Sequence, residues 1–251
     1  ENVDHNHSKK PGSLFVFIPM IEAKNINFRY EEGLILRNIS LKIKDGSFTA
    51  IIGANGSGKT TLAKHFNAIL APYSGSIYVD GIDTKKNELN ARKNVGFVFQ
   101  NFEDQLVYST VEEDIGFGLE NMGFCQDDIK YAANQILNKL NIANLAKRNV
   151  NMLSLGQKQL AALAGVLAMK PKYIIFDEPT TMLDAKNKKS IMEIIKELNK
   201  KEKIGIILVT NVLDDLKYAD NVIVLKNGEV IFDGKKMNLS KKMLKQAGLY
   251  D

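Results

Sequence analysis

The strongest chemical signal in the sequence is a glycine-rich stretch that ends in lysine and threonine. It runs from Gly53 to Thr60 as a glycine, four further residues and then Gly-Lys-Thr. Glycines let a backbone turn tightly, so that successive N–H groups converge on phosphate oxygens at the N-terminus of a following helix. In such a loop the lysine reaches the β- and γ-phosphates of a nucleotide, and the threonine hydroxyl ligates Mg²⁺. The residues expected to bind nucleotide here are Gly53, Asn55, Gly56, Ser57, Gly58, Lys59, Thr60 and Thr61, with Lys59 also catalytic.

Two adjacent carboxylates form the second chemical signal. Asp177 and Glu178 directly follow the apolar run at 173–176. In a phosphoryl-transfer site Asp177 would bind Mg²⁺ through water, and Glu178 would polarise the attacking water as general base. Taken alone, the pair could equally be a solvated strand end. The complete phosphate loop favours the catalytic interpretation.

Segments that alternate between strand and helix surround both motifs. The phosphate loop follows a β-rich run at 48–52 and precedes helical spacing at 60–70. Further strands are predicted at 21–30, 36–43, 173–176, 204–209, 221–225 and 229–232, and further helices at 157–169 and 188–201. Such alternation favours a mostly parallel sheet covered on both faces. The stretch at 101–150 lacks a long β-rich run and is typical of a helical insertion.

Composition excludes several classes of protein. The chain has 251 residues, 45% of them hydrophobic, and a net charge of +5, which excludes global disorder and suits one large or two small α/β domains. Cys125 is the only cysteine, which excludes a disulfide scaffold. No apolar run approaches the roughly 20 residues that a membrane helix needs. The lysines at 186–203 and 235–245 indicate solvated helix faces, and we expect no nucleic-acid partner.

A short segment between the two motifs, Leu153-Ser154-Leu155-Gly156-Gln157, brings in a family resemblance. With it, the chain from Ile21 to Gly234 resembles the ATPase subunits of ABC transporters, whose signature is Leu-Ser-Gly-Gly-Gln. The resemblance implies an α/β P-loop NTPase fold of the ABC type, with a mostly parallel core sheet, an antiparallel β subdomain and a helical subdomain at about 101–165. It also implies ATP and Mg²⁺ as cofactors. Chains of this family pair head to tail, so that the signature of one closes over the ATP held by the other.

The resemblance assigns roles to further residues. Ser154, Gly156 and Gln157 would contact the ATP of a partner chain. Gln100 would be the glutamine between Mg²⁺ and the helical subdomain, both as a metal ligand and in catalysis. Asp184 would be the aspartate of the loop at the dimer interface. Tyr30 matches the aromatic residue that stacks on adenine, although a core or edge-strand tyrosine is the alternative.

Three stretches, at 100–105, 110–121 and 177–184, narrow the resemblance to the energy-coupling-factor branch. Subunits of this branch power the uptake of vitamins or of transition-metal ions such as cobalt and nickel. The implied partners are a second ATPase subunit, identical or related, a membrane scaffold subunit and a substrate-binding membrane subunit. The implied location is peripheral, at the cytoplasmic face of the membrane, with residues 100–108 lining the groove for the scaffold.

The chain is expected to divide into three parts. We interpret residues 1–19 as a leader or a non-native extension and residues 20–234 as the ATPase domain. Residues 235–251 are expected to form a short helical C-terminal tail.

The sequence departs from the family pattern at three positions. Asn211 stands where the family has its switch histidine; an amide can donate a hydrogen bond to a γ-phosphate but cannot relay a proton. Leu155 replaces a signature glycine, and Leu160 replaces a frequent arginine. His65, the only histidine beyond residue 7, lies in the predicted helix after the phosphate loop and is expected to be a helix-surface or core residue.

These departures leave two hypotheses. In the first, the chain is a working ATPase, because Lys59, Thr60, Gln100, Asp177 and Glu178 are all present. In the second, it is an ATP-binding partner with attenuated hydrolysis in an asymmetric dimer, since loss of one γ-phosphate donor commonly costs about 10²–10³ in rate. An ABC protein acting on ribosomes or DNA fits less well, because the chain has room for neither a second cassette nor a long coiled coil.

Overall fold

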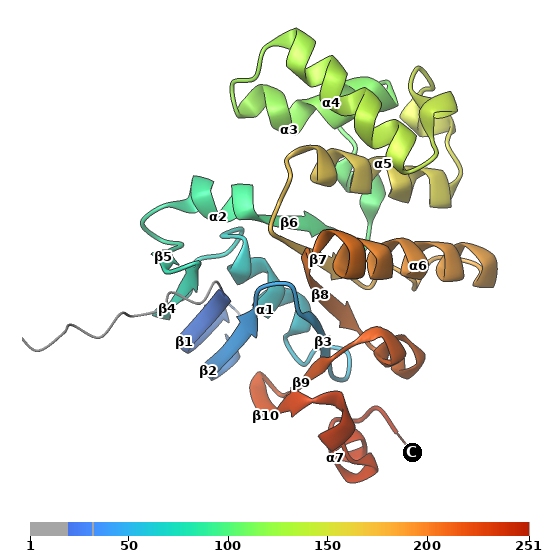
Figure 1. The fold of residues 1–251 in the computed structure, drawn as a ribbon. Helices are drawn as coiled ribbons and strands as arrows, with labels where there is room; N and C mark the ends of the chain where they lie inside the picture. The colour runs from blue at the N-terminus through green and yellow to red at the C-terminus, as the bar shows by residue number, and fades with distance from the viewer. Residues whose placement is uncertain (1–19, 32, 251) are drawn as a thin grey trace, which may run out of the picture.

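A six-stranded sheet forms the centre of the molecule in the computed structural model, which describes residues 20–31 and 33–250 (Figure 1). Its strand order is β10-β9-β3-β8-β7-β6. The strands are β3 (Phe48–Ile52), β6 (Val95–Val98), β7 (Tyr173–Asp177), β8 (Gly205–Thr210), β9 (Asn221–Lys226) and β10 (Glu229–Lys235). All neighbours are parallel except β10, which is antiparallel to β9. The carboxyl ends of β3, β7 and β8 therefore share one edge, where ligands bind in open α/β sheets.

A second sheet is wholly antiparallel and has the order β2-β1-β4-β5. Its strands are β1 (Met20–Tyr30), β2 (Gly33–Lys44), β4 (Ser74–Val79) and β5 (Ile82–Asp83). It corresponds to the antiparallel β subdomain expected from the resemblance. The expectation for residues 1–19 lies outside the described residues.

Three helices form a separate layer beyond the carboxyl end of β6, at the top of Figure 1. They are α3 (Val111–Asn121), α4 (Gln126–Lys139) and α5 (Leu155–Ala168). The start of α3 is fixed by a capping box, in which Thr110 accepts from the Glu113 backbone and the Glu113 side chain accepts from the Thr110 backbone. Short 3₁₀ turns η1 (Phe102–Gln105), η2 (Ala143–Leu145) and η3 (Val150–Met152) complete this helical insertion.

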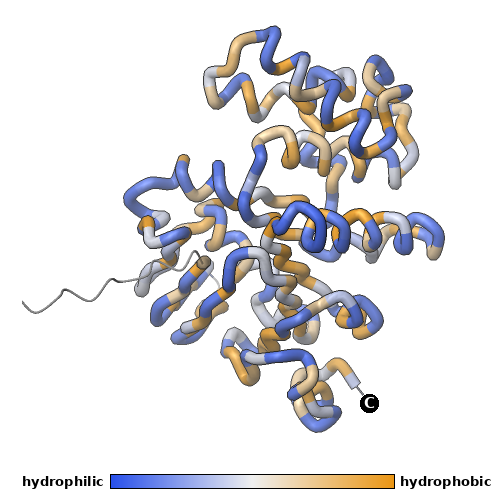
Figure 2. Tube along the Cα trace, in the orientation of Figure 1, coloured by the Kyte–Doolittle hydropathy of each residue, from blue (hydrophilic) through white to orange (hydrophobic). Residues whose placement is uncertain are grey.

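The remaining helices flank the two sheets. They are α1 (Lys59–Phe66), α2 (Glu88–Asn94), α6 (Ala185–Glu202) and α7 (Lys241–Gln246), with 3₁₀ turns η4 (Leu213–Tyr218) and η5 (Lys236–Asn238). The central strands alternate between two cores: Ile174 and Phe176 belong to one, and Tyr173 and Ile175 to the other. Hydrophobic residues run along these strands (Figure 2), as expected for a sheet buried on both faces.

Most predicted elements are confirmed within a few residues, but four were missed and one was too long. The helix predicted at 60–70 ends at Phe66, where Asn67 caps it and Ala68 adopts a positive φ of 56°. The missed elements β4, β5, β6 and α2 are all seven residues or shorter. Short elements carry little periodicity, and in β6 the absent side chain of Gly96 makes room for Val166 of α5.

Candidate functional site

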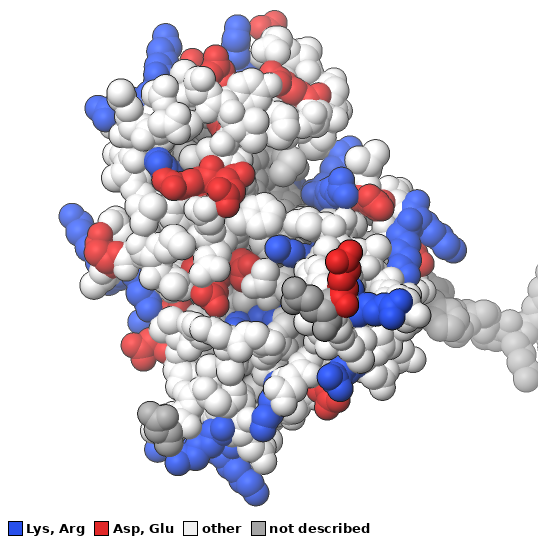
Figure 3. All heavy atoms as spheres, turned by 180° about the vertical axis from the view of Figure 1, so that it is seen from behind, with Lys and Arg blue, Asp and Glu red and all other residues white. Residues whose placement is uncertain are grey.

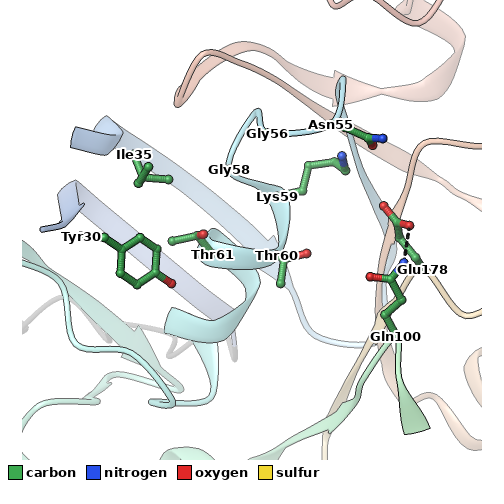
Figure 4. Close-up of a pocket in the computed structure, with 10 residues that line it drawn as sticks. All are labelled: Tyr30, Ile35, Asn55, Gly56, Gly58, Lys59, Thr60, Thr61, Gln100 and Glu178. Carbon is green, nitrogen blue, oxygen red and sulfur yellow. Dashed lines mark hydrogen bonds between the residues drawn. The ribbon is translucent and has the colours of Figure 1, made fainter. Parts of the chain in front are cut away.

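The candidate site is a cavity of about 400 Å³ at the carboxyl edge of the central sheet (Figure 4). Its walls come from the β1–β2 hairpin, the loop between β3 and α1, and the segments that follow β6 and β7. The lining residues are Tyr30, Ile35, Asn55, Gly56, Gly58, Lys59, Thr60, Thr61, Gln100 and Glu178. Residues predicted from the glycine-rich loop, the acidic pair and the family resemblance thus meet in one cavity.

The phosphate loop depends on glycine at two crowded positions. A Cβ at Gly53 would lie 2.3 Å from the Leu225 carbonyl oxygen of β9, and a Cβ at Gly58 would lie 2.9 Å from the Leu36 side chain. Gly58 also has a φ of 100° and caps α1 without a side-chain hydrogen bond. The first-turn N–H groups of α1 therefore have no side-chain cap, which makes them available to an anion.

Lys59 is almost completely buried inside this loop, with 5% of its surface exposed. Its ammonium group donates to the carbonyl oxygens of Gly53 at 2.9 Å and Ala54 at 3.2 Å. Burial lowers the pKa of Lys59, and the nearby charges of Glu178 and Asp177 oppose that shift. Both carbonyl bonds are within the loop itself, so the ammonium group can exchange them for phosphate oxygens without unfolding any element.

Thr60, which lines the cavity, is hydrogen-bonded directly to Asp177 at the end of β7. The Thr60 hydroxyl donates to Oδ1 of Asp177 at 2.9 Å. Burial at the end of β7 raises the pKa of the Asp177 carboxyl, an effect that this hydrogen bond partly offsets. Among the described residues, no group of three or more His, Cys, Asp or Glu side chains could hold a metal ion. The hydroxyl and carboxylate still fit Mg²⁺, since this ion commonly takes one or two carboxylates and completes its shell with substrate phosphates and water.

Glu178 is held in a strained conformation beside Gln100. Its backbone φ is 48°, in the left-handed region, and its N–H donates to the Val209 carbonyl of β8 at 2.9 Å. Its carboxylate accepts hydrogen bonds from Gln100 Nε2 at 3.1 Å and from Thr181 Oγ1 at 3.3 Å. The Gln100 side-chain oxygen faces the opposite way, toward Thr60 (Figure 4). Backbone strain of this kind is concentrated at functional sites.

Asn211 and Tyr30 lie at opposite sides of the phosphate loop. The Asn211 amide, just after β8, donates to Oδ1 of Asn55 at 3.3 Å, so it contacts the loop without lining the cavity. Tyr30 lies at the end of β1 with 46% of its surface exposed, and its ring packs edge-on against Phe28 at 4.8 Å. It thus lies at the end of an interior strand of the second sheet, and its ring borders the cavity, which keeps it accessible for stacking.

The signature residues and Asp184 do not reach this cavity. Ser154 and Gln157 cap each other at the start of α5, with hydrogen bonds of 3.0 and 3.4 Å. A Cβ at Gly156 would lie 3.2 Å from the Asn187 side chain of α6. Asp184 caps α6, and its pKa is lowered by hydrogen bonds, first from the Asn187 backbone. The signature and the Asp184 loop therefore lie side by side in a second cluster.

The structure shows what surrounds Leu160 and Leu155, two of the departures from the family pattern, and His65. Leu160 packs against the larger hydrophobic core, where a charged arginine would need a partner. Leu155 begins α5 with 37% of its surface exposed. His65 is fully buried, and its Nδ1 donates to the Thr61 carbonyl at 2.7 Å, since a carbonyl oxygen can only accept. Its complete burial confirms it as a core residue, and the same burial lowers the pKa of its imidazole.

Two features near the site were not predicted. Ile35 lines the cavity because the β1–β2 hairpin brings it beside the loop, a contact that only strand pairing reveals. Asp215 is buried and accepts from Thr180 at 3.0 Å and from Thr210 at 3.2 Å. It thereby joins the loop after β7 to the end of β8. The sequence signal that could have indicated it is the pair Asp214 and Asp215, which follows closely after Asn211.

The arrangement has the parts needed to bind and hydrolyse a nucleoside triphosphate. The lysine and free helix N–H groups can bind phosphate, the Thr60–Asp177 pair can hold Mg²⁺, and Glu178 can accept a proton from water. Positioning and electrostatic stabilisation supply most of the catalysis in such reactions.

Comparison with known proteins gives consistent matches. Residues 36–181 match the family model described as "ABC transporter". The chain is 44% identical to the energy-coupling factor transporter ATP-binding protein EcfA1 of Clostridium novyi, over 86% of this chain and 79% of that protein. Among solved structures, cbiO1 from Clostridium perfringens, described as part of the ABC transporter complex cbiONQ, has a TM-score of 0.80 and 36% identity, covering 92% of this chain and 95% of that one. The ATP-binding cassette MJ0796, solved as a dimer bound to ADP and Pi, has a TM-score of 0.77 and 31% identity, covering 86% and 98%.

Proposed function

Because the chain belongs to the ABC transporter ATP-binding family, we propose that it binds and hydrolyses ATP to energise a membrane uptake transporter of the energy-coupling-factor type. The observation that carries this proposal is the convergence of Lys59, Thr60, Gln100 and Glu178 on one cavity. The similarity to EcfA1 supports the transporter type.

The chain's own residues account for binding and orientation of the nucleotide. Lys59 exchanges its bonds to the Gly53 and Ala54 carbonyls for β- and γ-phosphate oxygens. Thr60 and the Gln100 oxygen, together with Asp177 through a water molecule, would hold Mg²⁺, and the bound ion would supply positive charge to the phosphates. Tyr30 stacks on the adenine. Ser57, Gly58 and Thr61 add phosphate contacts at the start of α1.

Hydrolysis then depends on Glu178 and Asn211. Glu178 accepts a proton from the attacking water, and its hydrogen bond from Gln100 orients the carboxylate. Asn211, already against the loop at Asn55, donates a hydrogen bond to the γ-phosphate. An amide donor supplies the electrostatic part of the switch residue's role without a charge of its own.

The second cluster is proposed to act on a partner chain. Ser154, Gly156, Gln157 and Asp184 lie outside the cavity of their own chain. In a head-to-tail pair they would close over the ATP held by the partner's loop. The dimeric form of a related cassette, 31% identical, supports this arrangement. The partner is a second ATPase subunit, identical or related.

No helix in the described part of the chain is long and apolar enough to cross a bilayer. We propose that residues 20–234 are the ATPase domain, docked peripherally at the cytoplasmic face of the membrane on a scaffold subunit that works with a substrate-binding membrane subunit. The scaffold groove is assigned to residues 100–108, where Val107 is 64% exposed. We propose that the transported solute is a vitamin or a transition-metal ion such as cobalt or nickel. The similarity to cbiO1, described as part of the ABC transporter complex cbiONQ, supports membrane partners.

Surface charge fits protein partners more readily than nucleic acid. On the face that Figure 3 shows, lysines and arginines lie in separate groups with white surface between them. Binding to a nucleic-acid backbone favours a continuous basic stripe or patch. The absence of a nucleic-acid partner stays a prediction.

The proposal is tested by measuring Mg·ATP binding and steady-state hydrolysis with the purified protein. Lys59→Ala should reduce hydrolysis by about 10³-fold or more, because it removes the one cation that reaches the phosphates from this loop. Lys201→Ala, on the exposed face of α6, is the matched control and should retain the wild-type rate. Equal rates in the wild type and in Lys59→Ala would overturn the proposal.

A further inference from the structure

The C-terminal segment Leu239–Tyr250 returns to the phosphate loop. The backbone N–H of Ala54 donates to the carbonyl oxygen of Ala247 at 3.2 Å, although the two residues are almost 200 positions apart. Ala247 is 2% exposed, and a Cβ at Gly248 would lie 3.5 Å from the Ala54 Cβ. The segment, which begins beyond β10 in Figure 1, is therefore in direct contact with the nucleotide-binding loop.

The segment's own structure fixes the position of the Ala247 carbonyl. Ser240 caps α7, and the helix ends in a turn in which Gly248 has a φ of 70°. The Gly248 N–H donates to Lys245 and the Leu249 N–H donates to Leu244, the pattern of a glycine-closed helix end. Leu239, Leu244 and Leu249 pack against the larger hydrophobic core. The carbonyl is thus presented by an anchored turn.

The Ala54 peptide is a critical place for such a contact. The N–H of the Gly53–Ala54 peptide group donates to Ala247, while the Gly53 carbonyl oxygen of the same group accepts from the Lys59 ammonium at 2.9 Å. The next residue, Asn55, accepts from Asn211 at 3.3 Å. One turn of backbone therefore receives the C-terminal segment, the phosphate-binding lysine and the switch-position amide. A shift of the Ala54 peptide moves the groups from which Lys59 must transfer to ATP.

We propose that the segment Leu239–Tyr250 positions the phosphate loop for ATP through the bond between Ala247 and Ala54. The proposal rests on the function proposed above, since it concerns the same ATP site. Positioning is reciprocal: ATP stabilises the docked segment, and anything that displaces the segment weakens ATP binding by the same factor. A change in this segment can therefore alter ATP affinity, although none of its residues lines the cavity.

Gly248→Val tests the proposal, because a β-branched residue strongly disfavours the positive φ at this position and opens the turn. The chain offers a matched control in Gly123, which closes α3 with a φ of 80° and the same two-bond pattern, Gly123 N–H to Glu120 and Phe124 N–H to Leu119. Gly248→Asn is the conservative variant, since asparagine tolerates a positive φ.

We expect the dissociation constant for Mg·ATP, measured by isothermal titration calorimetry, to rise by about 3- to 10-fold in Gly248→Val, the range for loss of one hydrogen bond. Gly123→Val and Gly248→Asn should stay within about twofold of the wild type by the same scale. Hydrogen exchange in residues 53–56 should accelerate in Gly248→Val alone. Wild-type affinity in Gly248→Val, or equal weakening in Gly123→Val, would overturn the proposal.

The wild-type protein provides a test that does not depend on a variant folding. Saturating Mg·ATP should slow hydrogen exchange in residues 241–250 and leave the turn at Gly123 unchanged. Equal exchange of residues 241–250 with and without ATP would contradict the proposed coupling. Failure of the wild type to bind Mg·ATP at all would instead overturn the function proposed for the site.

Discussion

The phosphate-loop cavity and the signature cluster differ in how they are built. The cavity is assembled within one chain by contacts between segments far apart in sequence, such as Thr60 with Asp177 and Gln100 with Glu178. In the signature cluster, Ser154 and Gln157 bond to each other at the start of one helix. The cavity is therefore ready to bind a ligand, whereas the signature presents a helix start with no ligand of its own. The contrast supports a site that is completed by a second chain.

A negative charge at Ser154 should have the largest effect that distinguishes the signature cluster from the cavity. Ser154→Asp keeps a good N-cap for α5 but places a negative charge where the partner's γ-phosphate is proposed to lie. Hydrolysis should fall by about 10²-fold, as for loss of a key electrostatic contact. Binding of Mg·ATP to a single chain should stay unchanged.

Ser154→Asn is the matched control, because it caps the helix without a charge. It should keep most of the wild-type rate, measured in the same steady-state hydrolysis assay. Equal rates for the Asp and Asn variants would remove the support for a phosphate facing the signature.

Asp177→Asn should show that an ionised Asp177 beside the cavity lowers the stability of the folded protein. Burial raises the pKa of Asp177, so the folded protein is penalised once the carboxyl is ionised, that is, as pH rises from about 4 through the folded-state value. The variant lacks this penalty. Its melting temperature at pH 7 should exceed that of the wild type by about 2 °C or more.

The gain should shrink as the pH falls toward 4, because fewer folded molecules then carry an ionised Asp177 carboxylate. Thermal unfolding of both proteins from pH 4 to 8, without nucleotide, measures this. A difference in melting temperature that stays constant from pH 4 to 8 would mean that the ionisation of Asp177 does not cause it.

His65→Phe should have the smallest effect on activity, because His65 lies in the core behind the loop. We expect hydrolysis to change by less than about threefold, since the ring touches Phe28 and Thr61 but does not line the cavity. The lowered pKa of His65 means that the unfolded state binds a proton more readily below about pH 6.5, so wild-type stability falls with pH there. The variant should show a shallower fall in a melting-temperature series. A large loss of hydrolysis in His65→Phe would contradict this prediction and indicate that His65 contributes to catalysis.

The chemical residues of the cavity were more predictable from the sequence than the residues that pack around the phosphate loop. Lys59 comes shortly after the β-rich run at 48–52 and Asp177 directly after the apolar run at 173–176, so both the elements and the edge they share could be anticipated. Ile35 and Ala247 could not, because strand pairing and a long-range backbone contact place them beside the loop. The left-handed conformation of Glu178 was equally hidden, since only the folded backbone shows its positive φ. Local patterns predict elements, whereas contacts between distant elements appear only once the chain is folded.

The central claim is that the cavity hydrolyses ATP with an asparagine at the switch position. The direct test is steady-state Mg·ATP hydrolysis by the wild type, Glu178→Gln and Asn211→His, each alone and with a related ATPase subunit. We predict a wild-type rate about 10²-fold or more above that of Glu178→Gln, as expected when the general base is removed. A wild-type rate that equals that of Glu178→Gln and rises sharply in Asn211→His would contradict this account and identify the chain as an ATP-binding partner with attenuated hydrolysis.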